Sequence, residues 1–294
     1  MNITDLIAFS INIEEIFSLA NLFMIAVALF WMIIASIQDF KRREVENWWN
    51  FSLIAFVLAF RAFLSIENWN YWYFIWGIIG LVAGFILMNA FYYGRMFAGG
   101  DAKLLMALGT ILPLSLSWKV NLGIFIAFIF LFLIAGAVYG LIYSFVLMAM
   151  NYKKFEKEFL WQFREYGKII YLLEIISLVF IISFWLAKFY LGVALSFILL
   201  ISPLLLIYAK TIEESCMMIK VDVKNLTIGD WIVNPVKAGK KIIKPNWEGL
   251  SERELKLIQK KLKGRVLVKQ GIPFVPAFLL AFIIMLYILH YNLI

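Results

Sequence analysis

Long apolar stretches with almost no charge dominate this sequence and limit what it can fold into. A helix needs about 20 predominantly apolar residues to cross a bilayer, since each residue advances it by about 1.5 Å. The 294-residue chain is 64% hydrophobic with a mean hydropathy of +0.90, whereas soluble domains average about half apolar residues. We therefore expect an all-α polytopic membrane protein. Its eight expected transmembrane helices are residues 21–37, 49–66, 72–93, 102–116, 121–150, 169–187, 189–209 and 272–290.

The distribution of positive charge predicts the orientation of these helices. Lys and Arg are retained in short loops on the cytoplasmic side of a membrane. With the N-terminus outside, the four cytoplasmic segments hold 24 of the 27 Lys and Arg residues. We therefore expect a multi-pass protein of the cell membrane. Its net charge of +8 follows from membrane-proximal loops and does not indicate a nucleic-acid partner. The four segments are residues 39–48, 94–103, 151–168 and 210–271, and only Arg61, Lys119 and Lys188 lie elsewhere.

One segment, residues 210–271, is polar enough to fold in water. Residues 218–223 and 231–236 have the pattern of short strands. Ser251-Glu-Arg-Glu254 is a capping box that opens an amphipathic helix. We expect a small cytosolic α+β insertion here. The expected domains are a membrane domain with seven helices (1–209), this insertion (210–271) and a last helix that completes the membrane domain (272–294).

Asp39 lies where the first expected helix meets the cytoplasm. A carboxylate at a helix C-terminus opposes the helix macrodipole, so local structure does not account for it and a function or a partner is needed. The alternative is an ordinary interfacial acid that pairs with a neighbouring base, Lys41, Arg42 or Arg43.

Asp101 lies at the same membrane face in the predicted topology. It follows Gly99 and Gly100 and precedes an apolar helix. Asp is a favoured N-cap and glycines suit a tight turn, so a purely structural cap is the alternative. Adjacent glycines also allow another backbone, such as that of a substrate, to approach closely.

Two carboxylates at one membrane face indicate a definite chemistry. Held together, they share one proton. The ionised group then takes a proton from water while the protonated one polarises a scissile carbonyl, as in aspartic proteases. This chemistry requires no metal, cofactor or covalent intermediate. The sequence has no HExxH or GxSxG motif, and its single histidine, His290, lies at the opposite membrane end.

Four further residues are candidates for substrate contact. Glu44 and Glu46 follow Asp39 in a charged loop that would attract a basic peptide, or they are simply solvated surface. Pro273 and Pro276 open the last helix. A proline inside a helix removes a backbone hydrogen bond, which is tolerated at membrane depth where protein or a cavity covers it. We therefore hypothesise that this helix entry lines the active-site cleft.

The residues around both aspartates form a recognisable pattern. They are Gln38-Asp39-Phe-Lys-Arg-Arg43-Glu-Val-Glu and Phe97-Ala-Gly-Gly-Asp101-Ala-Lys103-Leu-Leu-Met-Ala-Leu-Gly109. These stretches resemble the two aspartate motifs of archaeal prepilin and preflagellin peptidases, which are GxGD membrane aspartyl proteases. Position 98 is alanine where a strict GxGD motif has glycine. The segment 272–278 is similar to the last membrane helix of the same family.

The resemblance implies that Asp39 and Asp101 are the catalytic pair, that Gly99 and Gly100 shape the turn, and that Lys103 supports it. It also implies a substrate class, the class III signal peptides of prepilin and preflagellin precursors, which are cut at the cytoplasmic face between a short basic leader and a hydrophobic helix. The four-cysteine module of bacterial members is absent, so no N-methyltransferase activity is expected. The helices at 169–187 and 189–209 are additional to a minimal six-helix member.

Three other functions remain open on the residues alone. A transporter or proton-coupled channel predicts acids in the middle of its helices and repeated helical halves. An intramembrane protease of the signal-peptide-peptidase type, acting on other substrates, typically has a Tyr-Asp first motif, whereas Gln38 precedes Asp39 here. A non-catalytic assembly protein would tolerate replacement of both aspartates. The sequence does not determine the oligomeric state.

Overall fold

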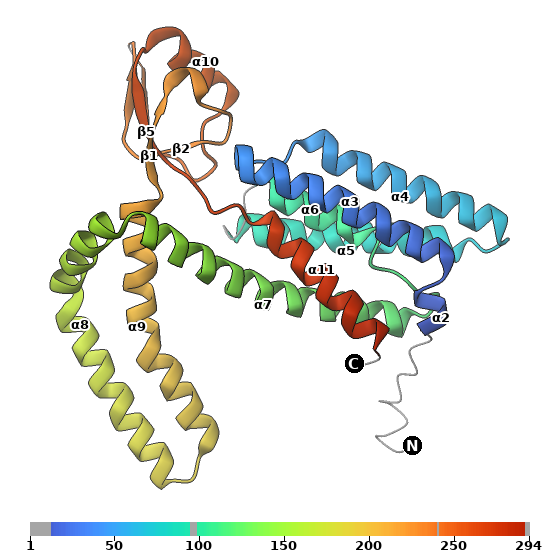
Figure 1. Cartoon of the computed structure of the whole chain (residues 1–294), viewed down its shortest axis with the longest axis horizontal. Coiled ribbons are helices and arrows are strands. Elements are labelled where there is room, and N and C mark those ends of the chain that lie inside the picture. Colours follow the sequence, from blue (N-terminus) through green and yellow to red (C-terminus); the bar gives the residue numbers. More distant parts are fainter. Residues whose placement is uncertain (1–12, 95–98, 240, 292–294) are drawn as a thin grey trace. The chain divides into compact units, whose positions relative to one another are not determined.

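The computed structural model describes residues 13–94, 99–239 and 241–291. Its contacts divide the chain into two compact units, residues 1–141 with 272–294 and residues 142–271. The first unit (Figure 1) contains α2 (Ile13–Ile16), α3 (Leu19–Arg42), α4 (Asn47–Glu67), α5 (Trp72–Tyr93), α6 (Gly99–Gly109), most of α7 (Trp118–Met150) and α11 (Val275–His290). The second holds the end of α7, α8 (Tyr152–Leu186), α9 (Tyr190–Cys216) and the strands. The domain division expected from sequence, which places α8 and α9 with the membrane domain, stays a prediction.

Six helices in the described part of the chain are long and apolar enough to cross a membrane: α3, α4, α5, α7, α8 and α9. The apolar helix α11 is shorter, with 16 residues. The structure therefore confirms a mostly helical protein with several candidate membrane helices. The total of eight crossings and the outward N-terminus stay predictions.

Glycines bring α5 and α6 unusually close together. A Cβ placed on Gly80 would lie 2.0 Å from the carbonyl oxygen of Gly109, and one on Gly84 would lie 3.0 Å from the backbone of Met106. Small residues at a membrane helix interface let two backbones approach in this way. The backbone of α6 is thus packed directly on α5, which sets the position of every side chain that α6 carries.

Helix α6 ends earlier than the sequence analysis predicts. The expected helix ran over residues 102–116, but α6 stops at Gly109 and a buried, non-helical segment follows over residues 110–115. Glycine favours a helix end, and Pro113 four residues later has no N–H for a helical hydrogen bond. The expectation of a helix through this whole stretch was wrong for these reasons.

Buried polar side chains satisfy this non-helical backbone. Arg61, only 2% exposed, donates from Nε to the carbonyl of Thr110 at 2.9 Å and from Nη2 to that of Pro113. Asn121 both donates to the carbonyl of Ser115 (2.7 Å) and accepts from its N–H (3.0 Å). Irregular backbone within a membrane persists only where such partners are present, so Arg61 has a structural role that its charge alone does not indicate.

Aromatic side chains form the contact between α7 and α11 in the first unit. The rings of Phe132 and Phe278 stack with centroids 4.2 Å apart, and both side chains are fully buried, as are those of Phe128 and Phe282. Glycine at position 136 makes room for the ring of Phe274, since a Cβ there would lie 2.6 Å from it. This packing holds the beginning of α11 in place.

The second unit begins with a hairpin of α8 and α9. Helix α8 starts at Tyr152, well before the expected start at residue 169. The reason is that residues 152–168 are rich in Lys, Glu and Gln, which are strong helix formers, so the charged segment continues the membrane helix. Within the hairpin, buried Gln162 donates to the carboxylates of Glu158 (2.9 Å) and Glu214 (2.8 Å).

The expected small α+β region before the last helix is confirmed. An antiparallel sheet with the order β1-β5-β2 packs beside a β3-β4 hairpin, and Ile258 of α10 lies at the centre of their common core. The capping box is present, with both Ser251 and Glu254 bonded as expected. The elements are β1 (Met218–Asp222), η1 (Val223–Asn225), β2 (Trp231–Ile232), β3 (Val236–Ala238), β4 (Lys241–Ile243), α10 (Glu252–Lys261) and β5 (Arg265–Lys269).

Candidate active site

Asp39 lies in the last turn of α3 and is 3% exposed. Its Oδ2 accepts a hydrogen bond from the backbone N–H of Val275 at 2.9 Å. Val275 is the first residue of α11, and the first N–H groups of a helix lack partners within it and attract negative charge. The unfavourable place of Asp39 at the end of its own helix is therefore compensated by the beginning of a helix far along the chain.

The basic residues after Asp39 do not act as one group. Arg42 pairs with Glu46 at 2.6 Å, and both side chains are well exposed. Arg43 is the neighbour whose charge acts on Asp39. The alternative of a simple interfacial ion pair therefore accounts for part of the surroundings of Asp39, but not for its burial or for its bond to α11.

Asp101 is half-buried in the first turn of α6. It lies inside the helix and not at the N-cap, so Asp101 is not the structural N-cap of the alternative interpretation. An acid in the first turn of a helix is still favourable. Its carboxyl group is close enough to Asp39 for the two charges to repel each other. The two aspartates of the sequence prediction are thus neighbours in this fold, and their role as one catalytic pair stays a prediction.

The two glycines before Asp101 differ in their surroundings. A Cβ on Gly100 would lie 3.2 Å from the backbone nitrogen and 3.3 Å from the carbonyl oxygen of Val45. The nearest atom to a Cβ on Gly99 would be a ring carbon of Tyr92, at an ordinary 3.8 Å. The backbone of the turn therefore packs directly on the loop that follows Asp39, and of the two glycines it is Gly100 at which a side chain would crowd a neighbouring backbone.

Two asparagines of α4 complete the link between the aspartate motifs. Lys103 donates from Nζ to Oδ1 of Asn47 at 2.6 Å, which gives this predicted support residue a partner. Asn50 donates from Nδ2 to the carbonyl of Gly100 at 3.1 Å. Sequence reasoning missed both asparagines. The available signal was the pair of amides, Asn47 and Asn50, in the otherwise mostly apolar first turns of a membrane helix.

The four candidate substrate contacts have different surroundings. Glu44 is exposed in the loop after α3, whereas Glu46 is tied to Arg42 and to the indole N–H of Trp48. Pro273 and Pro276 are both buried.

The structure corrects the reason given for Pro276. Helix α11 begins at Val275, so Pro276 occupies the first turn, where a missing N–H costs no helical bond. It does not interrupt the helix interior. The entry of α11 does adjoin the candidate site, through the N–H of Val275, while contact of these residues with substrate stays a prediction.

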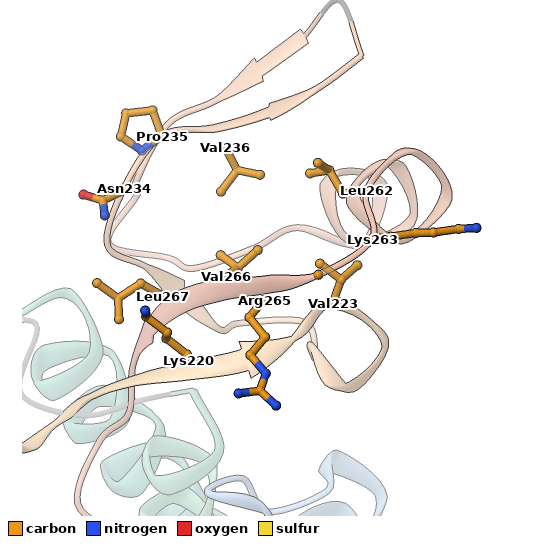
Figure 2. Close-up of a pocket in the computed structure, with 11 residues that line it drawn as sticks. Lys220, Val223, Asn234, Pro235, Val236, Leu262, Lys263, Arg265, Val266 and Leu267 are labelled. Carbon is orange, nitrogen blue, oxygen red and sulfur yellow. The ribbon is translucent and has the colours of Figure 1, made fainter.

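Two cavities in the described part of the chain are lined by residues other than the aspartates. The one of about 640 Å³ lies in the strand-containing region (Figure 2) and is lined by Lys220, Lys263 and Arg265 around apolar side chains. Another, of about 380 Å³, is entirely apolar and lies between α4, α5 and α6. Within the described ranges, no three His, Cys, Asp or Glu side chains are grouped to hold a metal. Chemistry without metal or cofactor stays a prediction.

Comparison with known proteins finds a family that is similar to the region of the candidate site. The type IV leader peptidase family matches residues 26–145, a region that contains both aspartates and the contacts between them. This matched region covers less than half of the chain, and it is what the chain has in common with the type IV leader peptidase family. The match confirms the resemblance to prepilin and preflagellin peptidases that the two motifs indicate.

The curated relatives are preflagellin peptidases of methanogenic archaea. The one from Methanocaldococcus jannaschii is 37% identical over 82 residues, which is 28% of this chain and 35% of that protein. The one from Methanococcus maripaludis is 32% identical over 127 residues, 41% of this chain and 55% of that protein. The one from Methanococcus voltae is 35% identical over 90 residues, 30% of this chain and 37% of that protein. The chain thus spans between about a third and just over half of each relative. No solved structure matches it.

Proposed function

We propose that this chain is a membrane aspartyl endopeptidase that removes class III signal peptides from prepilin or preflagellin precursors. The proposal is supported by the electrostatic interaction of Asp39 with Asp101, from two helices, inside the region that matches the leader peptidase family. Names of the curated relatives support the same activity and preflagellin as the substrate class.

The proposed mechanism uses the two carboxyl groups and water. Two like charges this close in a buried site share a proton. The ionised carboxylate takes a proton from water, whose oxygen attacks the scissile carbonyl, while the protonated carboxyl group donates a hydrogen bond to the carbonyl oxygen. Collapse of the tetrahedral intermediate breaks the C–N bond, and the leaving nitrogen takes up a proton. The N–H of Val275 holds the Asp39 carboxylate in orientation throughout.

The cytoplasmic membrane face suits the proposed substrate. The charge distribution of the sequence predicts that Asp39 and Asp101 lie at this face, where water reaches the carboxylates. The hydrophobic helix of the precursor stays in the lipid beside the enzyme, and its basic leader meets the loop that carries Glu44 and Glu46.

The test is the replacement of each aspartate with asparagine. In membranes that contain a preflagellin precursor, Asp39→Asn and Asp101→Asn each abolish cleavage, while Asp222→Asn, an exposed aspartate of β1 that pairs with Arg265, processes the precursor normally. Mass spectrometry of the new N-terminus identifies the cut and shows that no methyl group is added. Substantial cleavage by either site variant, with the chain correctly inserted, overturns the two-aspartate mechanism.

A further inference from the structure

Asn50 connects α4 to the turn that carries Asp101. Its side chain is 0% exposed, and Nδ2 donates to the carbonyl oxygen of Gly100 at 3.1 Å. That oxygen belongs to the peptide group whose nitrogen is the backbone nitrogen of Asp101. Because a peptide group is planar and stiff, a side chain that holds the oxygen also orients the beginning of Asp101.

Backbone satisfaction does not account for this bond. Gly100 lies in the first turn of α6, where the carbonyl of a helical residue accepts the N–H four residues later. The amide of Asn50 therefore supplies a second hydrogen bond to an oxygen that the helix already serves. This bond therefore orients the peptide group between Gly100 and Asp101, and it is not needed to pair the carbonyl oxygen of Gly100.

The side-chain oxygen of Asn50 also indicates a role other than stability. In the described part of the chain, Oδ1 is buried and has no hydrogen-bond partner. A buried acceptor without a partner lowers stability, and a leucine, which has the same branched shape without the polar atoms, would avoid that cost at this helix position. Stability alone therefore does not explain why an asparagine stands here.

We propose that Asn50 is a positioning residue that orients Asp101 toward Asp39 through the carbonyl of Gly100. The inference rests on the proposed peptidase function, which requires the two carboxyl groups to face each other. Two neighbouring contacts help to hold the same turn, namely the backbone of Val45 against Gly100 and Lys103 on Asn47. Of these three contacts, the Asn50 bond is the one that a side chain of α4 makes to the peptide group preceding Asp101.

The structural alternative is that Asn50 simply joins two helices, since polar side chains often do so in membranes. The two roles differ in what a substitution changes. A joining residue affects how well the protein holds together, and its loss lowers stability. A positioning residue affects the reaction, and its loss lowers kcat while KM and stability stay close to those of the wild type.

The test compares Asn50→Leu with a matched variant, Asn89→Leu. Asn89 is also an amide of a membrane helix, but it donates to a carbonyl of its own helix, that of Phe85, at 2.8 Å. Each variant is reconstituted in lipid nanodiscs with a preflagellin precursor as the probe. We expect Asn50→Leu to lower kcat about 10- to 100-fold, because small displacements of a catalytic group have effects of this size. KM and Tm remain near their wild-type values, Asn50→Gln recovers part of the rate by keeping a donor, and Asn89→Leu behaves as the wild type.

Hydrogen exchange provides a readout that needs no activity. We expect the amides at the beginning of α6 to exchange faster in Asn50→Leu and not in Asn89→Leu. Wild-type kcat in Asn50→Leu, a fall in Tm that parallels the fall in kcat, or unchanged exchange in α6 each overturns the positioning role. Failure of the wild type to cut the precursor, or cleavage by Asp39→Asn, instead overturns the proposed function. The exchange measurement still decides in that case whether Asn50 orders α6.

Discussion

The first unit of this chain and the strand-containing region of the second use polar residues in different ways. In the first, buried polar side chains join segments that are far apart in sequence, as Arg61 does with residues 110–113 and Asn50 with Gly100. In the strand-containing region of the second, polar groups are largely local and exposed, as in the capping box of Ser251 and Glu254. The difference teaches that the site in the first unit depends on long-range contacts, whereas the polar groups of the strand-containing region find most of their partners within a few residues.

The largest expected effect tests the close packing of α5 on α6. Gly80→Ala places a Cβ about 2 Å from the carbonyl oxygen of Gly109, where two backbones would have to separate, so we expect a loss of about 3 kcal/mol or more in unfolding free energy. Gly140→Ala on α7 is the matched control, because a Cβ there meets nothing within 4 Å and alanine favours helix. Thermal unfolding in detergent compares them, and equal stability of the two variants would show that the α5–α6 contact is looser than described.

The next test removes the buried arginine of the first unit. Arg61→Met leaves the carbonyls of Thr110 and Pro113 without their donor, and we expect a loss of about 2–3 kcal/mol, since hydrogen bonds from charged groups contribute about 1.5–3 kcal/mol each and the chain relaxes in part. Arg253→Met, on the exposed face of α10, is expected to change stability by less than about 0.5 kcal/mol. Similar losses of unfolding free energy in both variants would show that the buried polar contacts of Arg61 stabilise the fold no more than an exposed arginine of α10 does.

A smaller effect separates the two glycines at the site. Gly100→Ala pushes against the backbone of Val45, whereas Gly99→Ala meets only an ordinary contact. If the proposed function holds, we expect about a tenfold lower cleavage rate for Gly100→Ala, which equals about 1.4 kcal/mol in the activation barrier, and a rate within about twofold of wild type for Gly99→Ala. The rates are measured on a preflagellin precursor. A greater loss in the Gly99 variant contradicts the packing described for this turn.

The smallest effect concerns the local motif of the second unit. Ser251→Ala removes the cap of α10 and is expected to cost about 1 kcal/mol, seen as faster hydrogen exchange in α10. Bonds from the Ser251 hydroxyl and N–H lower the pKa of Glu254. A group with a lowered folded pKa stabilises above its unfolded value, about 4.3, and this stabilisation is lost as pH falls through the folded pKa. The difference between Ser251→Ala and wild type should therefore shrink in acid, and a constant difference would show that Glu254 takes no part.

The sequence predictions were right for most features that depend on local sequence, and they were incomplete for features that depend on long-range packing. The helices α3, α4 and α5 begin and end within a few residues of their expected limits, and the α10 capping box is present as expected. The early end of α6 and the long extension of α8 were missed. The partner of Asp39 was missed as well, because the N–H of Val275 reaches it only through the packing of α11 beside α3.

By itself, the sequence determined that this chain is built largely of membrane helices and that a small polar region precedes the last one, and it predicted Asp39 and Asp101 as the candidate catalytic pair. These features depend on the length of apolar runs and on motifs a few residues long, so local physics is sufficient for them. Tertiary structure alone decided which distant segments are in contact. Arg61 donates to the segment after α6, Gly100 packs on the loop at Val45, and Asn50 donates to the turn before Asp101. Such pairings depend on distances between segments far apart in the chain, and no local pattern encodes those distances.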